Sequence, residues 1–403
     1  MKKMLAILMS IMLVGTVIAG CGSGDAETPG NGETQTNGET PTDGGSAGKD
    51  GFEIALITDK GNIDDKSFNQ GSWEGVLQFV EKNDITHKYY KPEEASDAGY
   101  LAAIDLAVEG GAKVIVTPGF LFEVAVYEAQ TKYPEVKFIL LDGAPHTADY
   151  ATFKTEDNVA SILYAEEQAG YLAGYAAVID GMTDLGFMGG MAVPAVQAFG
   201  YGYLVGAEKA AEELGLPDGG VEVVYHYTGN FDENDTNKST AKTMYQEGVE
   251  VIFACGGSVG KSVMSAAAES DGLVIGVDVD QRYDSETVVT SSIKGLATSV
   301  NDVLEAIYKT DSFADYAGKT TVFNAENNGI GLPTTVIGDD KADAFDRFKT
   351  FDKAAYEKLY KTLTTEDLGL KRTLEVADTN GYATAEELTE QLNLVKVKVT
   401  TRQ

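Results

Sequence analysis

Cysteine and histidine are scarce in this chain of 403 residues, which limits the chemistry that the chain can perform. Its two cysteines, Cys21 and Cys255, are too few for the disulfide framework of a small secreted scaffold. Its three histidines are His87, His146 and His226, and none of them stands beside an obvious nucleophile or acid. The sequence therefore contains no motif for histidine-assisted catalysis, and we predict no catalytic residues.

Positive charge is also in short supply, because 31 Lys and Arg residues face 63 Asp and Glu residues, for a formal net charge of −32. Nucleic-acid binding needs clustered cations that contact phosphates, so a nucleic-acid partner is excluded. The segment Asp378-Thr379-Asn380-Gly381 resembles the start of a calcium loop, but its glycine stands at the fourth position instead of the sixth. We predict no metal site and no cofactor.

The amino terminus is typical of a secretory signal. Met1-Lys2-Lys3 precedes an apolar run from Met4 to Ile18, which is too short for an ordinary membrane-spanning helix. The next residues complete Ile18-Ala19-Gly20-Cys21, which resembles a bacterial lipobox. That resemblance implies cleavage of a signal peptide at residues 1–20 and acylation of Cys21, which would anchor the protein on the extracytoplasmic face of the cell membrane. Loss of Lys2 and Lys3 would change the net charge from −32 to −34.

Residues 22–50 contain no large apolar side chain and consist mainly of Gly, Ser, Thr, Asn, Pro, Asp and Glu. Such a segment cannot bury enough surface to fold. We predict that residues 21–50 hold the lipidated cysteine and a flexible tether. The folded part begins near Gly51 and is long enough for two domains of ordinary size.

From Phe52 to Leu141 the pattern alternates between buried strands and helices. Runs such as Val114-Ile115-Val116 and Phe138-Ile139-Leu140-Leu141 suit strands that are covered on both faces. Repeated strand–helix units predict a parallel, doubly wound sheet with right-handed crossovers.

A second series of the same kind follows, beginning with a predicted helix over Val159–Ile179 and ending with a strand over Leu273–Val277. The remainder fits no third domain: it contains a strand over Val288–Ile293, short strands over Thr321–Asn324 and Thr334–Ile337, and a helical stretch over Lys341–Leu363. A shorter helix over Glu386–Leu392 follows Thr384, a candidate cap. The alternating run Val395–Val399 predicts an edge strand.

These patterns predict an α/β protein with two doubly wound parallel-sheet lobes. In the simplest arrangement the chain returns to the first lobe near Thr290 and then crosses again, so three crossings form the hinge. The predicted N-terminal lobe comprises residues 51–156 and 289–325, and the C-terminal lobe comprises residues 157–288 and 326–403.

The stretch from Asp59 to Trp73 is predicted to connect the first strand to the first helix. Asp64 or Asp65 is a candidate N-cap, and Trp73 begins an apolar helix face. In open α/β sheets this loop lies at the carboxyl end of the strand, where ligands bind. Asp59 and Phe68 are therefore expected at the mouth of a site.

Similar residues follow the other predicted strands. They offer carboxylates, glycines, aromatic rings and one lysine, and they include Gly119, Phe120, Asp142, Phe199, Gly256, Asp278 and Lys294. Glycines allow a ligand to approach the backbone, carboxylates accept hydrogen bonds from hydroxyl or amino groups, and aromatic faces can enclose a flat ring. The ligand implied by this set is neutral, rich in donors and partly planar, and a sugar joined to a heterocycle fits.

Several separate motifs resemble those of the basic membrane protein family of bacterial substrate-binding lipoproteins, in its purine-nucleoside receptor type. The resemblance spans roughly Phe52 to Leu332. It rests on these stretches: Asp64-Asp65-Lys66-Ser67-Phe68-Asn69-Gln70 with Trp73, Asn158-Val159-Ala160-Ser161, Tyr171-Leu172-Ala173-Gly174, Gly186-Phe187-Met188-Gly189-Gly190-Met191 with Pro194 and Phe199, Gly276-Val277-Asp278-Val279-Asp280-Gln281, and Thr290-Ser291-Ser292-Ile293-Lys294.

The resemblance implies a type I periplasmic-binding-protein fold and a receptor that delivers nucleosides to the permease subunits of an ABC transporter. It implies that Phe68 and Phe199 enclose the base, and that Asp59, Asn69 and Asp142 belong to the same binding site. It also implies that Asp278, Lys294 and Gly256 hold the ribose hydroxyls. Two features depart from the family pattern: Cys255 at the start of the glycine-rich turn, and a longer segment beyond Lys341.

Three alternatives stay open. The two phenylalanines could stack on a simple sugar in a binding protein of the same fold. The aspartates at positions 59, 64 and 65 distantly resemble the cluster of calcium-dependent nucleoside hydrolases, although their spacing is wrong. A lipoprotein used for signalling or adhesion would need no transporter.

Overall fold

The computed structural model describes residues 52–337, 339, 342–371 and 384–402, so the predicted signal peptide, Cys21, the tether and the Asp378–Gly381 segment lie outside the described residues. The described chain is α/β, as predicted, and it builds two sheets. The first sheet has six parallel strands in the order β11-β5-β4-β3-β1-β2. Their bounds are β1 Ile54–Ile57, β2 His87–Tyr90, β3 Val114–Pro118, β4 Lys137–Leu141, β5 Val159–Tyr164 and β11 Lys319–Phe323.

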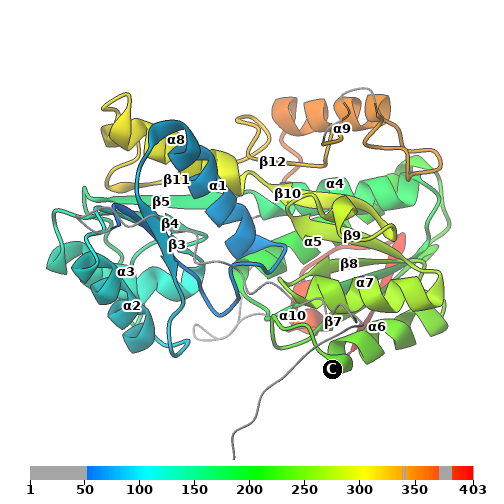
Figure 1. The fold of residues 1–403 in the computed structure, drawn as a ribbon. Coiled ribbons are helices and arrows are strands. Elements are labelled where there is room, and N and C mark those ends of the chain that lie inside the picture. Colours follow the sequence, from blue (N-terminus) through cyan, green and yellow to red (C-terminus); the bar gives the residue numbers. More distant parts are fainter. Residues whose placement is uncertain (1–51, 338, 340–341, 372–383, 403) are drawn as a thin grey trace, which may run out of the picture. The chain divides into compact units, whose positions relative to one another are not determined.

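Helices cover both faces of the first sheet (Figure 1). Ala55 and Ile57 of β1 face the apolar cluster that contains α2 (Asp97–Glu109) and α3 (Glu123–Lys132), whereas Ile54 and Leu56 face the cluster on the other side. The helices there are α1 (Phe68–Asn83) and α8 (Leu296–Tyr308). Alternate strand residues thus enter two cores, as the doubly wound arrangement requires. We call this sheet and its helices the first lobe.

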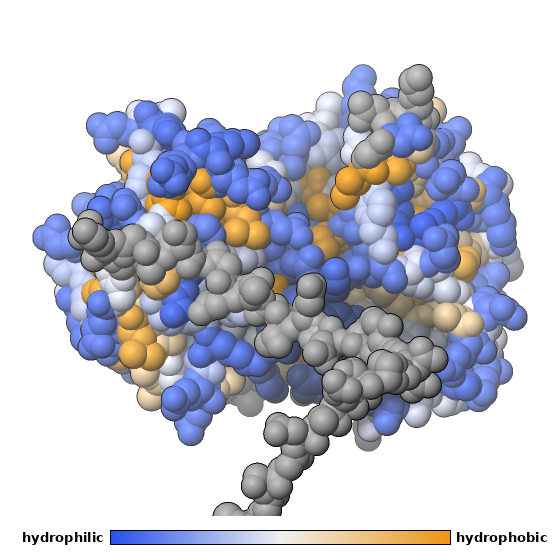
Figure 2. All heavy atoms as spheres, viewed as in Figure 1, coloured by the Kyte–Doolittle hydropathy of each residue, from blue (hydrophilic) through white to orange (hydrophobic). Residues whose placement is uncertain are grey.

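The second lobe is built on a seven-stranded sheet in the order β12-β10-β9-β8-β6-β7-β13, with only β12 antiparallel. Its strands are β6 Asp184–Gly189, β7 Val221–Tyr227, β8 Val251–Cys255, β9 Leu273–Asp278, β10 Val288–Lys294, β12 Ile330–Gly331 and β13 Val397–Arg402. Its longer helices are α4 Glu166–Ile179, α5 Pro194–Glu213, α6 Asp235–Gln246, α7 Val259–Ser270 and α9 Lys353–Thr365. Figure 2 shows hydrophilic residues over most of the visible face of the described part, with apolar residues beside α1, α8 and α9.

Two predictions about the lobe boundaries are wrong. Val159–Ile179 is not one helix, because Val159–Tyr164 forms β5 beside β4 in the first sheet and the helix starts at Glu166. The strand over Val288–Lys294 pairs with β9 in the second sheet, so the chain has not yet returned to the first lobe near Thr290. According to the strand pairings, the chain crosses between the two lobes at Ala165, at Gly295 and at residues 324–329.

The carboxyl-terminal part belongs to the second lobe. The predicted edge strand is confirmed, because β13 pairs with β7 at the end of the sheet. Thr384 forms the predicted capping box with Glu387 at the start of α10 (Ala385–Glu390). The helical prediction from Lys341 is wrong before Lys353, where the described residues form turns, and no strand forms over Thr334–Ile337.

The second lobe is reinforced by two helices, α4 and α5, that approach unusually closely. A Cβ atom on Gly202 would lie 2.0 Å from the carbonyl oxygen of Glu167, and one on Gly174 would lie 2.0 Å from that of Tyr203. Only glycine permits this backbone approach. Because α5 carries Phe199 and α4 starts with Glu166, the helix pair holds two residues of the site described next.

Among the described residues, none of the helices combines the length and the apolar character needed to span a bilayer.

Candidate ligand-binding site

One cavity is lined by the carboxyl ends of strands from both lobes. It brings together all eight residues predicted to bind the ligand: Asp59, Phe68, Asn69, Asp142, Phe199, Gly256, Asp278 and Lys294. This follows from the sheet topology, because the carboxyl ends of parallel strands share one edge and ligands bind outside that edge. That each side chain contacts a ligand stays a prediction.

The first lobe contributes a loop that is organised by Asp65. The buried Asp65 carboxylate accepts hydrogen bonds from the backbone N–H groups of Ser67, Asn69 and Gln70, at 2.8, 3.0 and 3.1 Å. Its side chain therefore satisfies N–H groups at the start of α1, but the N-cap residue is Ser67, so the prediction of Asp64 or Asp65 at that position is wrong. Burial raises the pKa of Asp65, and these hydrogen bonds oppose the rise.

Asn69 orients Asp59. Its Nδ2 group donates to Asp59 Oδ1 at 2.8 Å and to Asp65 Oδ2 at 2.9 Å, while its Oδ1 accepts the Asp59 N–H at 3.1 Å. Both amide hydrogens of Asn69 are thus used inside the loop. Burial raises the pKa of Asp59 to about 6, although hydrogen bonds from Gly61 and Asn69 lower it. The net effect is a carboxyl group whose pKa lies above that of an exposed aspartate.

Two phenylalanines from opposite lobes lie near one lysine. The ammonium nitrogen of Lys294 is 4.8 Å from the ring centroid of Phe68, 5.5 Å from that of Phe199 and 5.2 Å from that of Tyr164. Phe199 is 1% exposed and its ring meets Phe253 edge-on at 5.8 Å, whereas Phe68 is only partly buried. Each lobe therefore presents one aromatic wall to the cavity.

Lys294 is enclosed by carboxylates. Its Nζ lies 2.5 Å from Asp142 Oδ2 in the first lobe and 3.0 Å from Glu166 Oε1 in the second. Burial lowers the pKa of Lys294, but Asp142, Glu166 and Asp278 together raise it, and the net shift is upward. Lys294 therefore stays charged and links the two lobes. Glu166 was missed in the sequence because the helix predicted over Val159–Ile179 hid its position at a strand end.

Asp278 ends β9 in the left-handed region, with φ of 67°, and it is buried. The hydroxyl of Ser67 in the first lobe donates to Asp278 Oδ2 at 2.5 Å. Burial raises the pKa of Asp278, while the charge of Lys294 and the hydrogen bond from Ser67 lower it. Ser67 was part of the motif quoted from the sequence, but its partner is 211 residues away and could not be inferred.

Gly256 and its neighbours form the turn between β8 and α7. A Cβ on Gly256 would lie 2.7 Å from the backbone nitrogen of Gly190, so this turn packs on the one after β6. Cys255 is buried, and burial raises the pKa of its thiol. Sequence reasoning missed several apolar residues of the lining, namely Leu121, Val193, Val196 and Phe231.

The lining carries Asp59, Asp65, Asp142 and Asp278 but only one cation, Lys294. In the part of the chain that the structure describes, no three His, Cys, Asp or Glu side chains are grouped as metal ligands. The arrangement suits reversible binding of a neutral molecule with several donors and a flat apolar part.

Comparison with known proteins gives concordant results. A protein family described as "ABC transporter substrate-binding protein PnrA-like" matches residues 52–367. The chain is 30% identical over 376 residues to the "ABC transporter nucleoside-binding protein BmpA" of Lactococcus lactis, covering 87% of this chain and 97% of that protein. It is 28% identical to "Basic membrane protein A" of Borreliella afzelii, covering 71% of this chain and 85% of that protein.

Among solved structures, an ABC transporter solute-binding protein from Aeropyrum pernix K1 superposes with a TM-score of 0.69 at 23% identity, covering 84% of this chain and 98% of that one. At this identity the likeness concerns the fold, which is of the periplasmic-binding-protein type.

Proposed function

Because the chain belongs to the Bmp family of ABC transporter substrate-binding proteins, we propose that it binds a nucleoside, with a purine base favoured, between its two lobes. The family comprises substrate-binding proteins and not enzymes, so the hydrolase alternative is set aside. Proteins of this family work outside the cytoplasm, beside the membrane, and deliver a small molecule to permease subunits.

The observation that carries the proposal is the pair of aromatic walls, Phe68 and Phe199, on opposite lobes above Lys294. A base enclosed between two rings gains about 1–3 kcal/mol per stacked face, judged from base–aromatic stacking elsewhere. This gain is complete only when the lobes close, so binding and closure are coupled. A purine offers a larger flat surface than a pyrimidine and therefore more stacking.

The charges of the lining support a neutral nucleoside over a nucleotide. A phosphate group would add negative charge to a site in which Asp59, Asp142 and Asp278 already outnumber Lys294, whose charge is held by Asp142 and Glu166. Ribose hydroxyls, in contrast, can donate to Asp278. A ligand that lacks the matching hydroxyl would leave a buried carboxylate without a partner, which provides specificity.

The membrane anchor rests on the sequence alone. We propose that Cys21 is acylated after cleavage of residues 1–20 and tethers the protein to the extracytoplasmic face. Metabolic labelling with a fatty-acid analogue tests this: label on the wild-type chain and none on Cys21→Ser is the expected result, and equal label on both would contradict it.

The ligand is tested on the purified mature protein. Small molecules released by denaturation are identified by mass spectrometry, and a thermal-shift panel of nucleosides, free bases and sugars is measured in parallel. A ligand that binds only the folded state raises the melting temperature. A shift with purine nucleosides is expected. A response to a simple sugar such as ribose, with none to nucleosides, would keep the cavity and overturn the ligand.

A further inference from the structure

The loop between β1 and α1 reaches across to the second lobe at several points. Besides the Ser67–Asp278 hydrogen bond, Gln281 Nε2 donates to the carbonyl oxygen of Lys66 at 2.7 Å. Lys261 Nζ donates to the carbonyl oxygen of Asp64 at 3.0 Å. Three residues of one loop, Asp64, Lys66 and Ser67, thus meet three separate elements of the other lobe.

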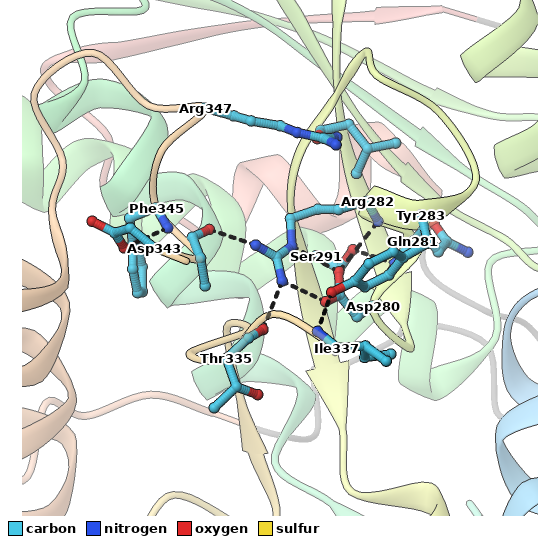
Figure 3. Close-up of polar contacts among 12 residues, drawn as sticks. Asp280, Gln281, Arg282, Tyr283, Ser291, Thr335, Ile337, Asp343, Phe345 and Arg347 are labelled. Carbon is cyan, nitrogen blue, oxygen red and sulfur yellow. Dashed lines mark hydrogen bonds and ion pairs between the residues drawn. The ribbon is translucent and has the colours of Figure 1, made fainter. Parts of the chain in front are cut away.

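The second lobe holds its side of these contacts rigidly. Gln281 begins the short helix η2 (Gln281–Tyr283), its Oε1 accepts the N–H of Val277 at 3.1 Å, and its own N–H donates to Ser291 Oγ at 3.0 Å. The next residue, the buried Arg282, donates to Asp280 and to the carbonyl oxygen of Thr335 (Figure 3). It also donates to the carbonyl oxygen of Ala344. Contacts within the second lobe therefore hold the Gln281 side chain in the orientation that reaches the first lobe.

One residue on each side of these interlobe contacts has an unusual backbone conformation. Lys66 has φ of 61° and Asp278 has φ of 67°, a region that residues other than glycine rarely adopt. Strained residues of this kind persist when surrounding contacts hold them, and they cluster at ligand clamps. For the first lobe, the contacts that hold the loop are the three backbone hydrogen bonds to Asp65.

We propose that residues 64–67 and the segment 278–281 form an interlobe latch, in which Ser67 is a positioning residue that couples lobe closure to recognition of a ligand hydroxyl by Asp278. The inference rests on the proposed function, because it takes Asp278 as the hydroxyl acceptor. Ser67 bonds one oxygen of that carboxylate, so the other oxygen can accept from the ligand. The Gln281–Lys66 hydrogen bond uses no ligand-binding group and stabilises the closed lobes whatever the ligand.

The shared carboxylate gives the latch a distinctive signature. When the ligand lacks the hydroxyl, Asp278 in the closed protein still has Ser67 as a donor. When Ser67 is also removed, the buried carboxylate loses both donors, and leaving a buried charged acceptor without donors carries the full desolvation penalty. The losses of binding free energy from removing the ligand hydroxyl and from removing the Ser67 hydroxyl should therefore be more than additive.

The test compares Ser67→Ala with Ser72→Ala, since Ser72 is a buried serine of α1, the helix that Ser67 precedes, and its hydroxyl donates to the Phe68 carbonyl within the first lobe. Dissociation constants for adenosine, 2′-deoxyadenosine and 3′-deoxyadenosine are measured by calorimetry. Ser67→Ala is expected to weaken adenosine binding about tenfold, as for a hydrogen bond to a charged group, and Ser72→Ala by no more than about twofold. For at least one deoxynucleoside, removal of the ligand hydroxyl should raise the dissociation constant by a larger factor in Ser67→Ala than in the wild type.

Equal dissociation constants in the two variants for all three ligands would overturn the latch, and so would strictly additive losses. A wild-type protein that binds ribose but no nucleoside would overturn the proposed function instead, and the ratio of Ser67→Ala to Ser72→Ala on ribose would still decide the latch. If the wild-type protein binds neither nucleosides nor ribose, amide hydrogen exchange tests the latch. Faster exchange of the backbone amides of residues 60–70 in Ser67→Ala than in Ser72→Ala would support the latch, and equal exchange would refute it.

Discussion

The two aromatic walls of the cavity are built on helices with the same local spacing but different surroundings. In each helix a phenylalanine is followed by glycines three and seven positions later. The residues are Phe68, Gly71 and Gly75 in α1, and Phe199, Gly202 and Gly206 in α5. In both cases the glycines let a neighbouring element approach the helix just beyond the ring.

The neighbours differ. In α5, Cβ atoms on Gly202 and Gly206 would lie 2.0 and 2.1 Å from carbonyl oxygens of α4, so backbone meets backbone within one lobe. In α1, a Cβ on Gly71 would lie 2.8 Å from Val279 Cγ1, a side chain of the other lobe, whereas one on Gly75 would lie 2.8 Å from the carbonyl oxygen of Ala297 in α8 of the same lobe. The glycines beyond Phe199 therefore contact one lobe alone, whereas those beyond Phe68 contact both lobes.

The largest expected difference between the walls is in stability. Phe199→Ala should lower the free energy of unfolding by about 3–5 kcal/mol, because the ring is fully buried in the second lobe. Phe68→Ala should lower it by much less, since that ring is only partly buried, yet weaken nucleoside binding at least about tenfold through lost stacking. Urea unfolding and calorimetry measure the two quantities. Equal losses of stability would refute the distinction.

The helix pair can be tested directly with Gly202→Ala. The added methyl would meet the carbonyl oxygen of Glu167, which belongs to the backbone and cannot move aside without shifting α4. Overpacking of this kind costs about 1–3 kcal/mol. Gly260→Ala in α7 is the control, because its nearest neighbour would be an ordinary 3.7 Å away. Urea unfolding of both variants should show a loss only for Gly202→Ala; a wild-type midpoint for Gly202→Ala would show that the pair can relax.

The carboxylates of the two lobes should respond differently to pH. Burial raises the pKa of Asp59 from 3.8 to about 6, and the groups that oppose this rise are hydrogen-bond donors and not a lysine. Burial also raises the pKa of Asp278, but there the positive charge of Lys294 opposes the rise. Protonated Asp59 stabilises the folded state below its unfolded pKa, and this contribution is lost as pH rises through about 6. Between about pH 4 and pH 7, the wild type should therefore lose roughly 1–3 kcal/mol of unfolding free energy relative to Asp59→Asn. If the unfolding free energies of the wild type and Asp59→Asn, measured with urea, changed in parallel with pH, the raised pKa of Asp59 would be contradicted.

The smallest expected effect concerns Lys261, which contacts residue Asp64 of the latch but lies outside the segment 278–281. Lys261→Met removes the hydrogen bond to Asp64 in the other lobe, and Lys242→Met removes an ion pair with Glu269 inside the second lobe. Both lysines are on neighbouring helices and both variants lose one charge. Exposed contacts contribute little, so Lys261→Met should weaken nucleoside binding only about twofold to threefold and Lys242→Met not at all. Equal affinities by calorimetry would limit the latch to its buried contacts.

Much of the site could be predicted because parallel strands place their carboxyl ends on one edge. The residues after each strand, such as Asp142 and Asp278, could therefore be grouped without knowing the sheet order. The order of the strands in the two sheets was harder to predict. Strand β10 has the same apolar pattern whichever sheet it joins, and β5 is followed directly by an alanine-rich helix that masked it. Contacts between side chains on different lobes, such as Ser67 with Asp278, leave no local signal at all.

The strand order also has a consequence for biosynthesis. The first sheet is completed by β11, which follows most of the second lobe in the chain, and β7 of the second sheet receives its edge partner β13 from the last strand that the structure describes. Pairings between such distant segments form slowly, because the loop between them must close first. During synthesis, the edge strands β11 and β13 therefore join sheets whose other strands have already been made.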